Sequence, residues 1–166
     1  MREWAPVSSF ALGAFGVGLV LLALVVRATD GFVPVLDHAN LVFHEAGHPL
    51  FGIFGDTAGL YGGTLGQLVF PLLAMVAFAW RGHTLGVAIA GVWLFENFFY
   101  IARYAADARE QILPLVGGGE HDWERILGRW HALDKDLKVA KVFRVVGVTG
   151  WLAVAGWLTY RWRKAR

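Results

Sequence analysis

Long apolar stretches constrain the fold of this chain more than any other feature of its sequence. Four of them are long enough to cross about 30 Å of hydrocarbon, and they cover residues 7–26, 64–80, 84–104 and 139–160. Hydrophobic residues make up 57% of the chain and charged residues only 17%, which is too apolar for an ordinary soluble domain of this length. The sequence therefore predicts an integral membrane protein with an all-α fold.

A fifth stretch, residues 34–54, is apolar but is interrupted by several polar and ionisable side chains and by Pro49. We expect it to be helical. The sequence leaves open whether this helix crosses the bilayer fully or enters and returns on the same side. The chain is thus predicted to be a single domain, residues 1–166, built as a polytopic bundle of four to five transmembrane helices.

Positive charge is concentrated at the C-terminus, and this gives the expected orientation. The basic residues of the tail are Arg161, Arg163, Lys164 and Arg166. Because basic residues favour the cytoplasmic side of a membrane, the C-terminus is predicted to be cytoplasmic and residues 105–138 to face outward. The tail also accounts for much of the net charge of +2, so the lipid bilayer is the expected partner and nucleic acid is not.

The segment His44-Glu45-Ala46-Gly47-His48 is the strongest chemical signal in the sequence. On an α-helix the two histidines are about one turn apart and differ in direction by about 40°, so a single metal ion can contact both. Glu45 lies about 60° around the helix from His48, close enough to reach a water on the metal without being a ligand itself. The pattern predicts a zinc site with Glu45 as the general base.

Ionisable groups in a membrane helix are costly unless they have a function, and this argues for the metal site over a polar packing cluster. The chain has no cysteine, so any metal must be bound by His, Asp or Glu. Zinc lowers the pKa of a bound water towards about 7, which lets a nearby carboxylate take its proton at neutral pH.

This segment, with its continuation Pro49-Leu50-Phe51-Gly52-Ile53-Phe54-Gly55, resembles the zinc helix of the site-2 protease class of intramembrane metalloproteases. The resemblance covers about a dozen residues. It implies that His44 and His48 bind zinc and that Glu45 activates water. In that class an aspartate from a later helix completes the ligand set.

A third protein ligand is expected, because a catalytic zinc usually has three plus an open position for water. His121 and Asp122 are the leading candidates, since they follow the glycine turn of residues 117–119 at the start of a predicted helix. Either one could bind the metal, or His121 could bind it while Asp122 orients the imidazole. The alternative is that Asp122 only caps the helix that follows.

Several other polar residues could have either a structural or a metal-binding role. Glu96 lies deep in the apolar stretch of residues 84–104, and Arg103 is seven residues later on nearly the same helix face, so a structural ion pair is expected unless Glu96 reaches the metal. Asp107, near the end of the same helix, is a weaker candidate ligand. Gly62 and Gly63 fall in a predicted connection rather than in a span.

The function predicted from these residues is a membrane-embedded, zinc-dependent hydrolase, most plausibly one that resembles a metalloprotease and cuts a membrane-embedded peptide. A zinc-dependent lipid amidase or esterase is the alternative enzyme, because the same activated water attacks an acyl carbon in a lipid. A non-catalytic metal-binding membrane protein is the third alternative, in which Glu45 would be a ligand or a structural partner.

Overall fold

The structure is a computed structural model in which residues 3–116 and 120–166 are described. These residues form helices and no strand, so the predicted all-α class is confirmed. The helices are α1 (Ser9–Ala28), α2 (Leu36–Gly52), α3 (Asp56–Trp80), α4 (Thr84–Ala106), α5 (Asp122–Arg129) and α6 (Asp136–Lys164), with a short 3-10 helix, η2 (Leu133–Lys135), before α6.

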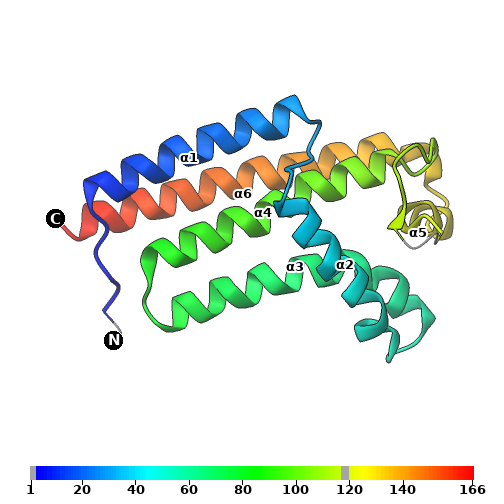
Figure 1. The fold of residues 1–166 in the computed structure, drawn as a ribbon, viewed down its shortest axis with the longest axis horizontal. Coiled ribbons are helices and arrows are strands. Elements are labelled where there is room, and N and C mark those ends of the chain that lie inside the picture. The colour runs from blue at the N-terminus through cyan, green and yellow to red at the C-terminus, as the bar shows by residue number, and fades with distance from the viewer. Residues whose placement is uncertain (1–2, 117–119) are drawn as a thin grey trace.

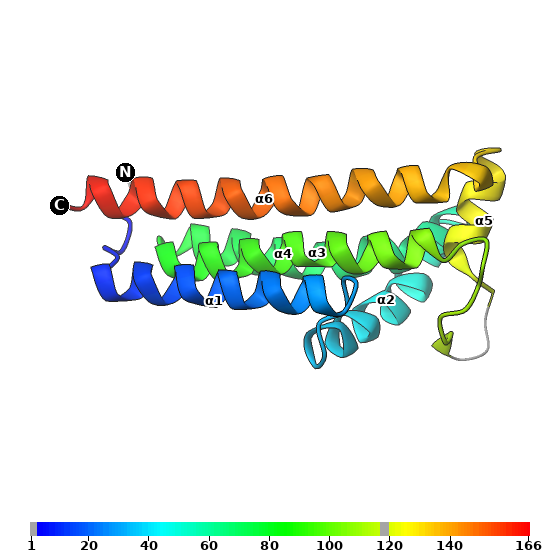
Figure 2. The same cartoon turned by 90° about the horizontal axis from the view of Figure 1, so that it is seen from above.

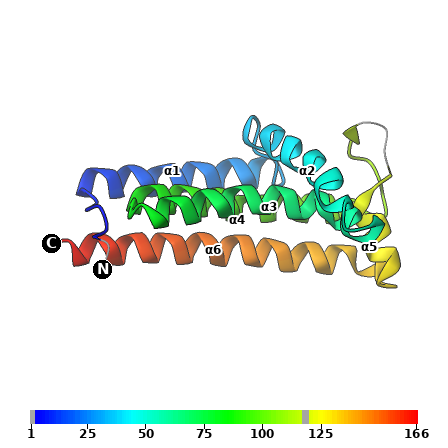
Figure 3. The same cartoon turned by 90° about the horizontal axis from the view of Figure 1, so that it is seen from below.

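Four long helices, α1, α3, α4 and α6, lie side by side along the length of the molecule (Figure 1, Figure 2). Helix α2 is oblique to them and packs against α3 towards one end, where the short helix α5 also lies (Figure 3). Both chain termini are at the opposite end. The bundle therefore has two distinct ends, one with the termini and one with α2 and α5.

Four helices are long and apolar enough to cross a membrane: Ser9–Ala28, Asp56–Trp80, Thr84–Ala106 and the segment Leu133–Lys164. Each overlaps one of the four apolar stretches identified in the sequence, and α1 is offset from its stretch by two residues. Large apolar side chains such as Val17, Leu24 and Leu152 are exposed on their outer surfaces, as expected where lipid rather than water covers a bundle. A multi-pass membrane protein is consistent with this surface.

Helix α2 does not run from one end of the bundle to the other. Helix α1 stops short of the α5 end, α2 continues obliquely towards that end, and the chain returns along α3 (Figure 1, Figure 2). The four helices that are long and apolar enough to cross a membrane do not include α2. Four crossings then leave both termini at the same end.

Glycines allow α2 and α3 to approach closely. Gly47 of α2 faces Gly62 and Gly66 of α3, and a Cβ atom on Gly47 would lie well inside contact distance of the Gly62 carbonyl oxygen. Small residues at a helix contact permit this approach in lipid. Gly62 and Gly63, which we expected in a connection, instead lie inside α3, which begins at Asp56.

A buried polar network joins α2 to α4. The side-chain amide of Asn40 donates to Asp37 at 2.8 Å and to Glu96 at 3.1 Å, and its oxygen accepts from the indole N–H of Trp93 at 2.8 Å. Asp37, Asn40 and Glu96 are fully buried. The expected pair between Glu96 and Arg103 does not form in the described part of the chain, because Glu96 faces Asn40 instead.

Candidate metal centre

Helix α2 places the two histidines of the sequence motif on one face. His44 is buried and His48 is half-buried, and their ring centroids are 5.0 Å apart. This separation is what the four-residue spacing predicts for one turn of α-helix.

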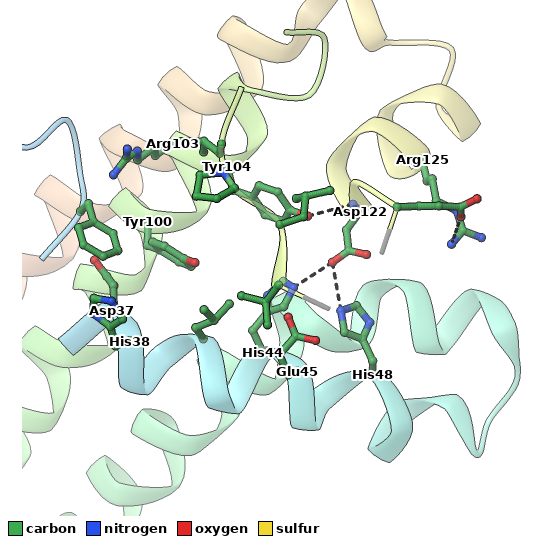
Figure 4. Close-up of a pocket in the computed structure, with 17 residues that line it drawn as sticks. Asp37, His38, His44, Glu45, His48, Tyr100, Arg103, Tyr104, Asp122 and Arg125 are labelled. Carbon is green, nitrogen blue, oxygen red and sulfur yellow. Dashed lines mark hydrogen bonds and ion pairs between the residues drawn. The ribbon is translucent and has the colours of Figure 1, made fainter. Parts of the chain in front are cut away.

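Asp122, the first residue of α5, faces both histidines. Its Oδ2 lies 2.9 Å from Nε2 of His44 and 3.1 Å from Nε2 of His48 (Figure 4). All three side chains offer a ligand atom within 4.8 Å of the others. Residues from two distant parts of the chain thus form one cluster that could bind a metal ion.

The spacing of these ligand atoms can be compared with that of a known type of metal site. In a tetrahedral zinc site the ligand atoms are about 3.4 Å apart. The two distances from Asp122 to the histidines, 2.9 and 3.1 Å, are close to this value, and all three ligand atoms lie within 4.8 Å of one another. Two imidazoles and one carboxylate form a ligand set typical of catalytic zinc, with one position left for water or substrate.

Gly63 of α3 leaves room for the two histidine rings because it has no side chain. A Cβ atom on Gly63 would lie 2.5 Å from Nε2 of His44 and 2.6 Å from Nε2 of His48. Any side chain at this position would therefore displace both candidate ligands. This role of Gly63 could not be predicted from the sequence, because it depends on the packing of α2 against α3.

Hydrogen bonds outside the cluster orient two of its members. Nδ1 of His48 lies 2.9 Å from the carbonyl oxygen of Gly59, so Nδ1 carries the proton and Nε2 faces the cluster. The backbone N–H of Asp122 donates to the hydroxyl of Tyr104 at 3.1 Å. Partners of this kind fix ligand orientation at metal sites.

His48 and Asp122 form an ion pair within the cluster. The hydrogen bond with Asp122 raises the pKa of His48 to about 9, although burial acts against this. Burial raises the pKa of Asp122, but hydrogen bonds with His44 and His48 outweigh it and lower this pKa to about 2. Asp122 is therefore an anion at neutral pH, and His48 carries a second proton, on Nε2, that must leave when a metal binds there.

His121 does not join the cluster. It caps α5, because its Nδ1 accepts from the backbone N–H of Glu124 at 3.2 Å, and its Nε2 faces Asp107 at 3.4 Å. Burial lowers the pKa of His121, so the ring is neutral. In the structure His121 caps α5 and Asp122 faces the two histidines of α2. This is the reverse of the alternative in which His121 binds the metal and Asp122 orients the His121 ring.

The other candidate ligands also lie outside the cluster. Asp107 accepts from the backbone N–H groups of Ile112 and Leu113, at 2.9 and 3.0 Å, and so holds the connection that follows α4. Glu96 belongs to the network with Asn40. The glycine turn of residues 117–119, which we expected to deliver the third ligand, lies outside the described residues.

A cavity of about 650 Å³ opens beside the cluster. Glu45 is exposed to it, and Figure 4 shows its carboxylate on the same side of α2 as the two histidines. Tyr104 also lines the cavity, and its ring is 5.9 Å from that of His44. The apolar part of the wall comes from Leu41 and residues 113–116. Tyr104 was not identified from the sequence, because nothing in its local pattern distinguishes it from other aromatic residues of the span.

No protein-family model matches this chain, and comparison with curated proteins and with solved structures finds no match either. The function is therefore inferred from the geometry of the site.

Proposed function

We propose that the protein is a membrane-embedded, zinc-dependent hydrolase. The observation that carries this proposal is the convergence of His44, His48 and Asp122 beside a cavity that Glu45 also lines. A ligand cluster alone is compatible with metal storage. A free carboxylate next to the ligands, with room for a substrate, is what hydrolysis requires.

Each side chain has a role in this proposal. A zinc ion held by His44, His48 and Asp122 would polarise a substrate carbonyl and acidify the attacking water. Glu45 accepts the proton of that water and then delivers it to the leaving group. The hydroxyl oxygen of Tyr104 accepts from Asp122 N–H, so its own proton is free to be donated to the oxygen that gains negative charge.

The substrate is proposed to be a peptide, in keeping with the resemblance of the motif to site-2 proteases. The shared features are a histidine pair on one helix and an aspartate from a later segment, here Asp122. A lipid amide or ester is the second candidate, and the apolar wall formed by Leu41 and residues 113–116 favours it. Both reactions use the same site.

A reconstituted system would test this proposal. Protein in nanodiscs is incubated with a fluorescent single-span peptide and, separately, with a fluorescent lipid amide and ester. We expect one of these to be hydrolysed, hydrolysis to stop when a chelator removes zinc, and activity to return with about one zinc per chain. Failure of the zinc-loaded protein to hydrolyse any of the substrates would contradict the proposal in favour of a non-catalytic metal protein.

We further propose that the site faces away from the cytoplasm. The cluster lies at the α5 end, opposite the termini and the basic tail (Figure 1), and basic residues favour the cytoplasmic side.

Single cysteines test this orientation cleanly because the chain has none. Both Glu110, at the α5 end, and Ala165, in the tail, are exposed. In intact cells we expect an impermeant thiol reagent to label Glu110→Cys, and to label Ala165→Cys only after permeabilisation. The opposite pattern would reverse the orientation.

A further inference from the structure

A second charged group faces the cavity at a distance from the candidate ligands. Arg103 lies in the last turns of α4, is half-buried and lines the cavity. Its guanidinium is 5.3 Å from the centre of the Phe32 ring, a cation–π contact that positions the group without neutralising it. Figure 4 shows Arg103 and Tyr100 towards one end of the site and Asp122 and His48 towards the other.

Arg103 makes no ion pair with the described residues. The nearby carboxylates are engaged elsewhere: Asp37 accepts from the backbone N–H of Val33 and from Asn40, and Glu96 accepts from Asn40. Arg125, the other arginine of the cavity, differs because it pairs with Glu120 at 2.8 Å. Within the described chain, Arg103 therefore has no ion-pair partner within 4.0 Å, although Asp37, which lines the same cavity, is near enough to attract its charge.

A structural explanation accounts for part of this placement. A cation near the C-terminus of a helix interacts favourably with the helix dipole, and a long side chain can extend towards the membrane surface. Neither effect requires the guanidinium to line a cavity that also contains a candidate catalytic site. An arginine in such a place presents several donors to a carboxylate or phosphate.

We propose that Arg103 binds an anionic group, a carboxylate or a phosphate, of an amphipathic ligand that occupies this cavity. The apolar part of the ligand lies along Leu41 and residues 113–116, and its acyl carbonyl reaches the cluster of His44, His48 and Asp122. The assignment of the acyl carbonyl rests on the proposed hydrolase function. The anion site itself depends only on Arg103 and the cavity.

Binding of three short probes tests this proposal without requiring turnover. Hexanoyl-glycine carries a carboxylate, hexyl phosphate carries a phosphate, and hexanoyl-glycinamide is neutral. Their affinities are measured by calorimetry on detergent-solubilised, zinc-loaded protein carrying Glu45→Gln, so that no probe is consumed. Hydrogen bonds to a charged group predict that at least one anionic probe binds about tenfold to a hundredfold more tightly than the neutral one.

Variants at the two arginines of the cavity show whether the preference for an anionic probe comes from Arg103 itself or from the overall positive charge of the cavity. Arg103→Gln should abolish the preference for the anion, and Arg103→Lys should retain part of it. Arg125→Gln is the matched control and should leave the preference unchanged, because Arg125 is already paired. The probe that shows the preference identifies the source of the anion, a carboxylate as in a peptide terminus or a phosphate as in a lipid headgroup.

Two results would overturn the anion site. One is equal binding of all three probes. The other is a preference that survives Arg103→Gln but disappears when zinc is removed, which would mean that the anion binds the metal. If the wild-type protein hydrolyses nothing but the Arg103-dependent preference is present, the hydrolase proposal fails while the anion site stands.

Discussion

Replacing Glu45 with glutamine is expected to lower kcat by about a thousandfold, within the range of about 10² to 10⁴ that general-base catalysis contributes. Glutamine has nearly the same shape but cannot accept the proton of the attacking water. Zinc content should be unchanged, since Glu45 lies outside the cluster of His44, His48 and Asp122. The measurement is turnover per bound zinc, with the metal quantified in the same preparation.

Glu110→Gln is the matched control, because Glu110 is an exposed carboxylate that does not line the cavity. It should retain full turnover. Two outcomes at Glu45 would argue against its role as a base. Full turnover in Glu45→Gln would mean that another group takes the proton, and loss of zinc would make Glu45 a ligand, as in a non-catalytic metal protein.

Gly47→Ala is expected to destabilise the protein by about 1–3 kcal/mol, the usual cost of overpacking a well-packed contact, or by more. The added methyl group would meet the backbone carbonyl of Gly62, and backbone cannot rotate away as a side chain can. Helices α2 and α3 must then separate, which also moves His44 and His48 relative to Gly63. We expect a lower midpoint of thermal unfolding in detergent together with weaker zinc binding.

Gly13→Ala provides the comparison within the same chain. Gly13 is exposed in the second turn of α1, and a Cβ atom there would meet nothing within 4 Å. Its substitution should leave stability unchanged or slightly increase it, because alanine favours helix more than glycine does. Equal unfolding midpoints for the two variants would show that the close approach of α2 and α3 is not essential.

The parts of this molecule that could be predicted from sequence are those set by local periodicity. Hydropathy identified the four long helices, because each must present apolar side chains to lipid over its length. The spacing of His44 and His48 predicted that they share a face, since one turn of helix determines it. The starts of helices were less predictable: α3 begins at Asp56, eight residues before its predicted span.

The rest of the site depends on contacts between distant residues. Asp122 meets His44 across 78 positions of sequence, and nothing local distinguishes it from its neighbour His121. Their different roles follow from the way α5 packs, because Asp122 then faces the cluster while His121 faces Asp107. The role of Gly63 likewise exists only because α3 packs against α2.

Similar reasoning applies to α2. The sequence left open whether this helix crosses the bilayer, and in the structure it lies obliquely towards one end of the bundle (Figure 3). Its polar residues Asp37 and Asn40 form a network with Glu96 of α4. Periodicity within α2 shows which residues share a face but not which helix that face will contact.

Zinc content per chain, measured by elemental analysis of detergent-purified protein, tests the central claim most directly. The proposed site predicts about one zinc per chain in the wild type, with loss in His44→Ala and Asp122→Ala and full retention in His121→Ala. Retention in Asp122→Ala with loss in His121→Ala would move the third ligand to His121. Wild-type protein without zinc, or zinc content that none of these variants changes, would contradict a metal centre at these residues.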